Sequence, residues 1–240
     1  MWERGACHTP RAGWRSSVRR VSTTSRDESY VPALAHDRLT PLFDVAVRVL
    51  LRERRFKQQL LQQAAVGPGQ RVLDIGCGTG TLAIMVKRAQ PAADVVGLDG
   101  DPAILELGRA KVADARVDVR LDQGMSFELP YEDASFDRVL SSLFFHHLKP
   151  DAKARTAREV ARVLRPGGEL HVADFGPAAD PLQAAALAIV RRVDGEEETR
   201  DNLSGRLPDI FRAGGLADAR VHGRLRTLSG TLEFLSARRG

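Results

Sequence analysis

The stretch VLDIGCGTGTL at residues 72–82 decides the fold of this chain, because it predicts a buried strand, a glycine-rich turn and the start of a helix. Its glycines are spaced G-x-G-x-G and are followed by Thr81. A dinucleotide-binding turn requires G-x-G-x-x-G, and a phosphate-binding P-loop requires a lysine after its last glycine. Neither pattern is present. The glycines still let a ligand approach the backbone closely, or let the backbone take positive φ.

Asp74 stands at the mouth of this turn, just before the first glycine. Pyrophosphate binds to the free amides and positive dipole of a helix N-terminus, and a carboxylate placed there would repel it. A ligand with a cationic group and no phosphate therefore suits the turn better. The alternative is that Asp74 only braces the turn through backbone amides.

Strands and helices alternate along the rest of the chain. The predicted strands are 71–75, 94–98, 117–121, 136–141 and 169–174, with two late strands at 217–223 and 230–236; the predicted helices are 42–66, 82–89, 102–112, 152–164 and 181–193. Pro166-Gly167-Gly168 is predicted to turn the chain into the strand at 169–174. This order indicates a mostly parallel sheet covered on both faces, with ligands bound beyond the carboxyl ends of its strands.

Asp99 ends the strand that follows the glycine turn, nineteen residues after Gly80. A carboxylate at this position can accept hydrogen bonds from both hydroxyls of a ribose. Together with Asp74, it predicts a ligand that is a nucleoside with a cationic, zwitterionic extension.

Four segments carry a family resemblance: VLDIGCGTG at 72–80, VVGLDGDP at 95–102, LPYEDASFDRVLSSLFFHHL at 129–148 and EVARVLRPGGELHVAD at 159–174. In order and spacing they resemble the motifs of class I S-adenosylmethionine-dependent methyltransferases, and they are similar to the small-molecule group of ubiquinone/menaquinone C-methyltransferases. The resemblance covers about residues 66–175. It implies an α/β fold with a Rossmann-like, doubly wound, seven-stranded sheet, mostly parallel with the last strand antiparallel, and helical lid elements.

The resemblance also implies S-adenosyl-L-methionine as cofactor and a set of residues that bind it. Asp74 would lie beside the ammonium group, and Asp99 would bind the ribose hydroxyls. The others are Gly76, Cys77, Gly78 and Gly80 along the methionine part, Gly100 and Asp101 beside the adenosine, Met125 and Ser126 at the adenine, and Ser141 and Leu143 at the methionine end. Many relatives have an aspartate where Met125 stands, so the polar contact to adenine would fall to the backbone or hydroxyl of Ser126.

His146 and His147 are the candidate catalytic residues, because they follow the fourth predicted strand, close to the expected methyl acceptor. Either could act as a general base or position the acceptor. The alternative is that one packs against a helix while the other is exposed. No metal site is expected, because adjacent histidines should point apart and no carboxylate cluster is expected to join them. Asp151 is expected to cap the following helix, and Cys77 to fill the turn.

The basic charge of the chain lies in its first residues. Residues 1–26 hold six arginines and one acidic residue, which accounts for the net charge of +5, and the remaining residues have 30 basic and 30 acidic side chains. This neutral remainder disfavours nucleic acid as a partner. Residues 1–27 are predicted to be a disordered basic tail; the alternatives are sequence upstream of a mis-set start and an organelle transit peptide.

One methyltransferase domain is predicted over residues 28–240: an N-terminal helical lid segment at 28–66, a cofactor-binding core at 67–175, a lid or helical segment at 176–215 and the last strands at 216–240. The chain has no run of 18 or more apolar residues, so no membrane span is predicted. Its two cysteines favour a reducing compartment, and we expect a cytoplasmic location.

The predicted function is methyl transfer to a small, hydrophobic or aromatic molecule by in-line displacement. Tyr30, Phe43 and His147 are candidate acceptor-binding residues, and Leu187 and Val190 offer further apolar surface. Two alternatives stay open: a catalytically silent, S-adenosylmethionine-binding regulatory subunit, and a nicotinamide-dependent oxidoreductase, against which the glycine spacing and Asp74 count.

Overall fold

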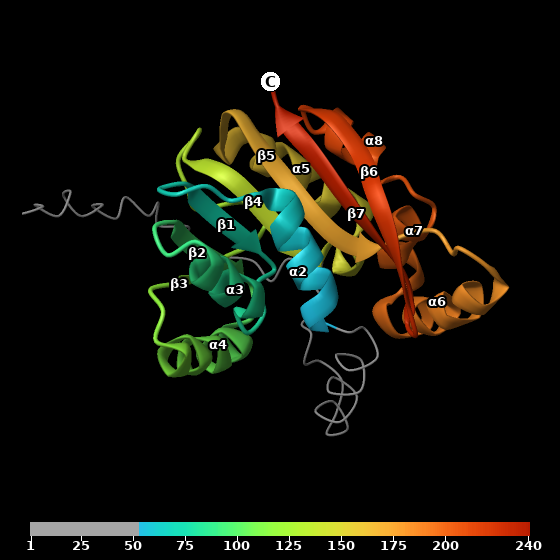
Figure 1. Ribbon diagram of the computed structural model, residues 1–240. Coiled ribbons are helices and arrows are strands. Elements are labelled where there is room, and N and C mark those ends of the chain that lie inside the picture. Colours follow the sequence, from blue (N-terminus) through green and yellow to red (C-terminus); the bar gives the residue numbers. More distant parts are fainter. Residues whose placement is uncertain (1–52) are drawn as a thin grey trace, which may run out of the picture.

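The computed structural model describes residues 53–240 of the chain (Figure 1). The strands are β1 (Arg71–Ile75), β2 (Asp94–Asp99), β3 (Arg120–Gln123), β4 (Phe136–Ser142), β5 (Leu164–Phe175), β6 (Leu216–Thr227) and β7 (Gly230–Arg239). The helices are α2 (Glu53–Ala64), α3 (Thr81–Ala89), α4 (Pro102–Ala115), α5 (Pro150–Val163), α6 (Pro181–Asp194), α7 (Glu196–Leu203) and α8 (Leu207–Ala213), with a short 3₁₀ turn, η1 (Phe145–His147). The basic tail, the first part of the 42–66 helix, Tyr30 and Phe43 lie outside the described residues.

The seven strands form one sheet in the order β3-β2-β1-β4-β5-β7-β6. Strands β1 to β5 pair in parallel, and β7 pairs antiparallel with both β5 and β6. The predicted fold class is therefore confirmed. The strand order reverses between β1 and β4, and open sheets of this kind bind ligands in the crevice at that point, beyond the carboxyl ends of the strands.

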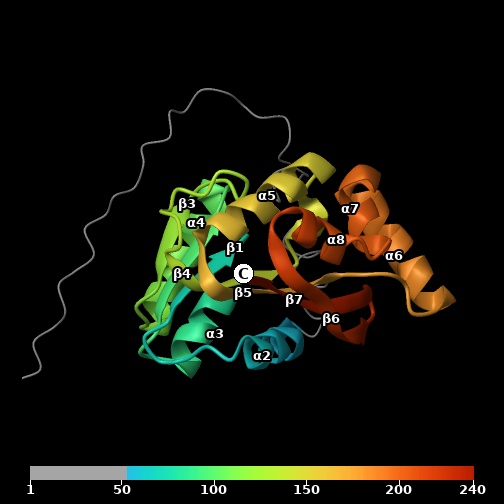
Figure 2. The same ribbon diagram turned by 90° about the horizontal axis from the view of Figure 1, so that it is seen from above.

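Helices cover both faces of the sheet, as Figure 2 shows with α2 and α3 on one side and α5 and α8 on the other. On the first face, Phe56 and Leu60 of α2 pack with Val72 and Leu82. On the second face, the ring of Phe145 contacts that of Phe211 edge-on, with centroids 5.2 Å apart. Both faces bury fully desolvated apolar side chains, which fixes the sheet between its two helical layers.

Two strand predictions differ from the structure. The strand predicted at 117–121 is β3, which begins at Arg120 because Arg116 ends α4 in a left-handed conformation and β3 pairs with β2 only from Arg120 onward. The Pro166-Gly167-Gly168 segment lies within β5, where the register with β4 shifts between the pairs that Leu164 and Glu169 make. The turn chemistry therefore produces a bulge in a long strand and does not separate two elements.

The helices also bring corrections. Asp151 does not cap α5: Lys149 is the N-cap, without a side-chain hydrogen bond, and Asp151 lies in the first turn. The helices α7 and α8 were not predicted, since each has fewer than nine residues and shows little periodicity. Three glutamates at 196–198 make up the first turn of α7, where negative charge suits the helix dipole.

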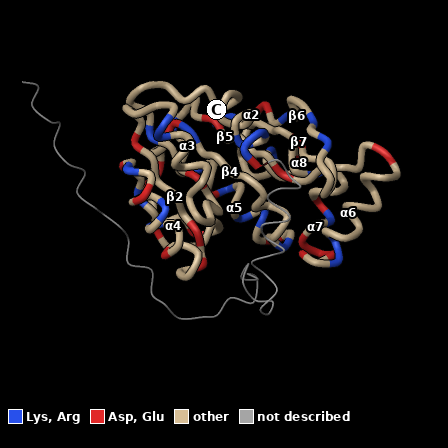
Figure 3. The backbone as a smooth tube through the Cα atoms, turned by 60° about the horizontal axis from the view of Figure 1, so that its bottom comes forward, with Lys and Arg blue, Asp and Glu red and all other residues tan. Residues whose placement is uncertain are grey.

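The surface of the described residues mixes both signs of charge, with Lys and Arg interspersed among Asp and Glu along the tube (Figure 3). Within residues 53–240, no helix has the length and apolar character needed to cross a membrane.

Candidate functional site

The glycine turn connects β1 to α3 in a conformation that only glycine adopts easily. Gly76, Gly78 and Gly80 have φ values of +64°, +53° and +72°. A Cβ on Gly76 would lie 2.1 Å from Cδ2 of Phe144, whereas a Cβ on Gly78 would meet nothing within 4 Å. Gly80 is the N-cap of α3 and packs toward Leu121. The backbone at Gly78 is therefore open to a ligand, and we call this segment the glycine cradle. Gly76 and Gly80, in contrast, are closely packed against neighbouring side chains.

Asp74 lies under this cradle at the end of β1, and only 1% of its surface is exposed. Neither of its carboxylate oxygens has a hydrogen-bond partner among the described residues. Burial raises the pKa of Asp74 to about 7, even though the charge of Lys57 and the nearby amide of Ala83 lower it; Asp99 adds to the rise. A buried carboxylate without partners is costly, so this position favours a ligand that brings a cation. The nearby Ala83 amide is also compatible with the bracing role weighed for Asp74, so both interpretations stay open.

Asp99 ends β2 and holds the turn in place. Its Oδ2 accepts a hydrogen bond from the Gly78 amide at 2.8 Å, and its Oδ1 accepts one from the Asp101 amide at 3.1 Å. Burial raises the pKa of Asp99 above its ordinary value. Asp101 is the N-cap of α4, with its Oδ1 accepting from the Ala103 amide at 2.8 Å. The carboxylate of Asp101 therefore serves the helix, and its contribution to a ligand would come from its backbone.

A pocket opens beside the turn. It brings together five of the predicted residues: Gly76, Asp99, Gly100, Met125 and Ser126. Five further lining residues were not predicted: Leu98, Gly124, Phe127, Phe144 and Leu148. Their positions beside predicted residues in the chain are the only signal in the sequence that could have indicated them.

Two predicted residues have other contacts. The Ser126 hydroxyl is buried and lies 2.8 Å from the Thr156 hydroxyl, so only its backbone is left for an adenine ring. Cys77 is buried against Gly97, and burial raises the pKa of its thiol, as expected of a residue that fills space. Neither residue offers a reactive group to the pocket.

The end of β4 shows local strain. The Ser141 side chain is fully buried, and its hydroxyl has no partner among the described residues. Leu143 has a φ of +53°, which is rare for a leucine, and its amide donates to the Ala173 carbonyl at 2.9 Å. Such strain persists only where the surrounding structure enforces it, and it is concentrated at functional sites.

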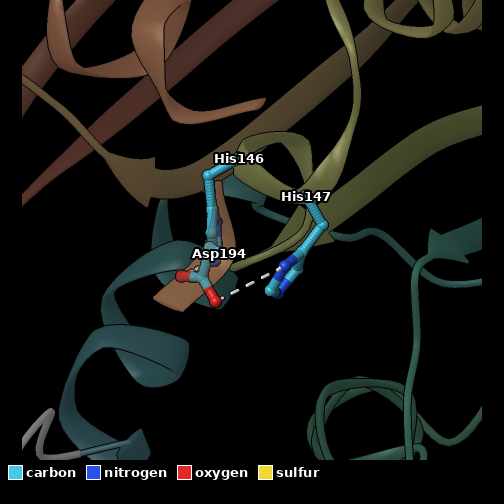
Figure 4. Close-up of side chains that lie close together, drawn as sticks. All are labelled: His146, His147 and Asp194. Carbon is cyan, nitrogen blue, oxygen red and sulfur yellow. Dashed lines mark ion pairs between the residues drawn. The ribbon is translucent and has the colours of Figure 1, made fainter. Parts of the chain in front are cut away.

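His146 and His147 lie just beyond this point and meet Asp174 and Asp194; Figure 4 shows both histidines with Asp194. His146 Nδ1 lies 2.6 Å from Asp174 Oδ1, and His146 Nε2 lies 3.7 Å from Asp194 Oδ2. His147 Nδ1 lies 3.9 Å from Asp194 Oδ1, and the two rings have centroids 4.0 Å apart. The expectation that the histidines point apart and that no carboxylate joins them is therefore wrong, because η1 turns both rings toward the end of α6.

The pKa values of the two histidines shift in opposite directions. Burial opposes charge on His146, but Asp174 and Asp194 raise its pKa above the ordinary value. Burial and the neighbouring His146 lower the pKa of His147, which is therefore neutral near pH 7. Burial raises the pKa of Asp194, while His146 and its hydrogen bonds bring that of Asp174 below its ordinary value.

Within residues 53–240, His146, His147 and Asp194 also place one ligating atom each within 4.8 Å of one another. Two imidazoles and a carboxylate are groups that divalent transition metals bind. The expectation that no metal binds here stays a prediction.

The chain is similar in sequence to known proteins. A family model described as a methyltransferase domain matches residues 72–168. The demethylmenaquinone methyltransferase of Deinococcus radiodurans is 33% identical over 153 residues, and the alignment covers 63% of each chain. The uncharacterized methyltransferase sll0829 of a Synechocystis species is 32% identical over 186 residues, which cover 78% of this chain and 84% of that protein. The chain belongs to the class I S-adenosylmethionine-dependent methyltransferases.

The fold of the methyltransferase is also found among solved structures. The YcgJ protein of Bacillus subtilis has a TM-score of 0.64 at 19% identity, and the match covers 78% of this chain and 98% of that one. The methyltransferase spans 63% of the length of its Deinococcus relative, just under two thirds.

The residues of the methyltransferase fit the cofactor that its family uses. The buried oxygens of Asp74 lack partners, the backbone at Gly78 is open, and Asp99 lines the adjoining pocket. The ammonium group of a ligand would pair with the Asp74 carboxylate, and its nucleoside would occupy the open backbone at Gly78 and the pocket lined by Asp99.

Leu187, which the sequence analysis lists as apolar surface near the acceptor, is 3% exposed and packs against Gly230 in the core. The apolar residues that α6 exposes are Leu182, Ile189 and Val193.

Proposed function

We propose that this methyltransferase transfers the methyl group of S-adenosyl-L-methionine to a small, hydrophobic or aromatic molecule by in-line displacement. The observation that carries the proposal is the buried Asp74 carboxylate, which accepts no hydrogen bond from the residues that the structure describes and lies beside an open glycine cradle. The Deinococcus relative, named as a demethylmenaquinone methyltransferase, supports an acceptor of this class.

The bound cofactor supplies an electrophilic methyl group on a sulfonium, and the protein supplies alignment and a dry pocket. In this proposal Asp74 binds the ammonium group, Asp99 the ribose, and Met125 and Ser126 border the adenine. The remaining members of the binding set are Gly76, Cys77, Gly78, Gly80, Gly100, Asp101, Ser141 and Leu143. Of these, Cys77 and Asp101 would contribute through their backbone, because their side chains are already engaged in packing and helix capping.

His147 is the proposed positioning residue for the acceptor, with Tyr30 and Phe43 as further acceptor-binding residues. Its neutral imidazole faces Asp194 through Nδ1, which leaves Nε2 to accept a hydrogen bond from an acceptor hydroxyl. His146 supports it from the buried side through its bond to Asp174. Asp194, whose pKa is raised by burial, can then hold the proton that the acceptor loses.

The test is methyl transfer from isotopically labelled cofactor to a panel of quinols, phenols and amines, followed by mass spectrometry. We expect labelled product from at least one quinol or phenol. Tight cofactor binding without transfer to any acceptor would favour the silent regulatory subunit, and failure to bind the cofactor would refute the proposal.

We also propose that the partners are small molecules and not nucleic acid, in a cytoplasmic setting. The interspersed Lys, Arg, Asp and Glu along the described residues (Figure 3) support this proposal, because nucleic-acid binding depends on clustered basic side chains.

A further inference from the structure

Three side chains at the acceptor end of the site form a group whose chemistry suits a metal ion. His146 Nε2 lies 3.7 Å from Asp194 Oδ2, and His147 Nδ1 lies 3.9 Å from Asp194 Oδ1. Figure 4 shows the Asp194 carboxylate beside the two imidazoles. Within residues 53–240, no other three histidine, cysteine or acidic side chains bring their ligating atoms together in this way.

The spacing of these atoms is close to that of ligands on one ion. Zn²⁺ binds imidazole nitrogen and carboxylate oxygen at about 2.0–2.2 Å, so two ligands of a tetrahedral ion lie about 3.4 Å apart. The separations of 3.7 Å and 3.9 Å are only a few tenths of an ångström longer. Rotation of the side chains can close this difference, and the His147 ring, which is 37% exposed, has room to rotate.

Asp174 holds His146 in the orientation that a metal ligand needs. Its Oδ1 lies 2.6 Å from His146 Nδ1, and its Oδ2 accepts hydrogen bonds from the Phe144 and Phe145 amides. When Nδ1 donates its proton to this carboxylate, the Nε2 lone pair of the neutral ring faces Asp194. A lone pair facing a carboxylate oxygen is unfavourable without a positive charge between them, which a proton or a metal ion supplies. Metal-binding histidines almost always have such a carboxylate, carbonyl or water on their other ring nitrogen.

The ligand set selects the kind of ion. Two imidazoles with one carboxylate favour Zn²⁺ and other divalent transition metals over Mg²⁺ and Ca²⁺, which prefer oxygen ligands. The His147 and Asp194 side chains are 37% and 20% exposed, whereas His146 is buried. An ion bound here would therefore be held from the buried side and stay accessible from the other.

We propose that His146, His147 and Asp194 bind one divalent transition-metal ion, and that the bound ion inhibits methyl transfer. A metal on Nδ1 of His147 forces the ring proton onto Nε2, which then cannot accept a hydrogen bond from the acceptor hydroxyl. The same ion occupies the Asp194 carboxylate, which is assigned to the acceptor proton. The inhibition rests on the proposed function, but the metal binding does not. The expectation that no metal binds would then apply to the active form of the enzyme alone.

Zinc binding is measured by isothermal titration of the full chain with Zn²⁺, without cofactor. The wild type should show a site that His147→Gln and Asp194→Asn each weaken about 10-fold or more, since even an outer carboxylate contributes on this scale. His222→Gln is the matched control, because this exposed histidine lies 2.6 Å from the Ser236 hydroxyl and should leave the site unchanged. The cysteine and histidines before residue 53 are the same in every variant, so any zinc they bind is common to all.

X-ray absorption of the zinc-loaded wild type tests the ligands without any variant. We expect two imidazole nitrogens at about 2.0–2.1 Å from the zinc. Equal zinc affinity in all four proteins, or bound zinc without imidazole ligands, would overturn the site.

Inhibition is measured as methyl transfer by the wild type over a range of Zn²⁺ concentrations. Transfer should fall with a midpoint at the dissociation constant found by titration, a chelator should restore it, and Mg²⁺ at the same concentrations should leave it unchanged. Zinc bound at the site with transfer undiminished would overturn the inhibitory role. A metal-free protein that binds zinc but not S-adenosylmethionine would refute the proposed function and leave the metal site standing.

Discussion

Binding of S-adenosylmethionine should expel a proton from Asp74. The perturbation is a change of pH from 7 to 6. In the free protein, burial raises the pKa of Asp74 to about 7 from its ordinary 3.8. The ammonium group of the cofactor favours the ionised carboxylate, so the protein binds it best once that proton has left.

The size of the effect follows from the ionised fraction. With a pKa of about 7, roughly half of Asp74 is ionised at pH 7 and about a tenth at pH 6. If only the ionised form binds, the apparent dissociation constant should rise about 5-fold from pH 7 to pH 6. Close to one proton should leave per cofactor bound at pH 6.

Isothermal titration in two buffers of different ionisation enthalpy measures both quantities. The observed binding enthalpy should differ between buffers in proportion to the protons released, and Asp74→Asn should remove that difference. An affinity that is the same at pH 6 and pH 7, with no dependence on the buffer, would refute the assignment of Asp74 to the ammonium.

The raised pKa has a consequence for the free protein as well. Below pH 3.8, Asp74 is protonated in both the folded and the unfolded protein, so its burial does not cost stability. As pH rises from 3.8 toward 7, the unfolded chain releases this proton before the folded protein does, so the free energy of unfolding falls. Urea unfolding between pH 4.5 and pH 7.5 should show the loss in the wild type, whereas a variant with no titrating group at this position should not show it.

Three further predictions concern the frame of the site. Phe145→Ala should lower the free energy of unfolding by about 3–5 kcal/mol, because this fully buried ring leaves a cavity; urea denaturation measures it, and a loss below about 1 kcal/mol would contradict the packing described. Gly76→Ala should lose cofactor affinity, because φ at this residue is +64° and a Cβ there would meet the ring of Phe144. Gly223→Ala should keep its affinity, because a Cβ there would meet nothing within 4 Å. Titration of both variants with the cofactor tests this, and equal affinities would contradict it. His146→Gln should lower the free energy of unfolding most at low pH. Asp174 raises the pKa of His146, so the charged pair stabilises the fold below pH 6.5, and this contribution falls as pH rises beyond that. Unfolding at pH 5.5 and pH 8.5 should show a smaller difference between variant and wild type at the higher pH, and a constant difference would count against the pair.

Much of the cofactor end of the site was predictable because it is local in sequence. The glycine spacing, Asp74 and Asp99 lie at the ends of two strands whose apolar runs are legible in the chain, and parallel strands bring their carboxyl ends to one edge. The same reasoning placed the starts of five of the seven strands within one residue, but it began β3 three residues early, where polar residues replace the apolar pattern, and β5 five residues late.

The acceptor end was not predictable in this way. Asp174 and Asp194 reach His146 from the end of β5 and the end of α6, 28 and 48 residues further along the chain. No local pattern relates such positions, and adjacent histidines on a regular helix or strand would diverge. Their contact depends on η1 and on Asp174, whose Oδ2 accepts from the Phe145 amide at 2.7 Å.

The sequence by itself determined most of the order of the strands and helices along the chain, the glycine turn and the two carboxylates of β1 and β2 beside it, because backbone preference and apolar periodicity act over a few residues. Only the tertiary structure decided which side chains meet across elements, as the two histidines do with Asp174 and Asp194. The physical reason is that desolvation and pairing of charges depend on distances that packing sets, and packing joins residues the chain keeps far apart.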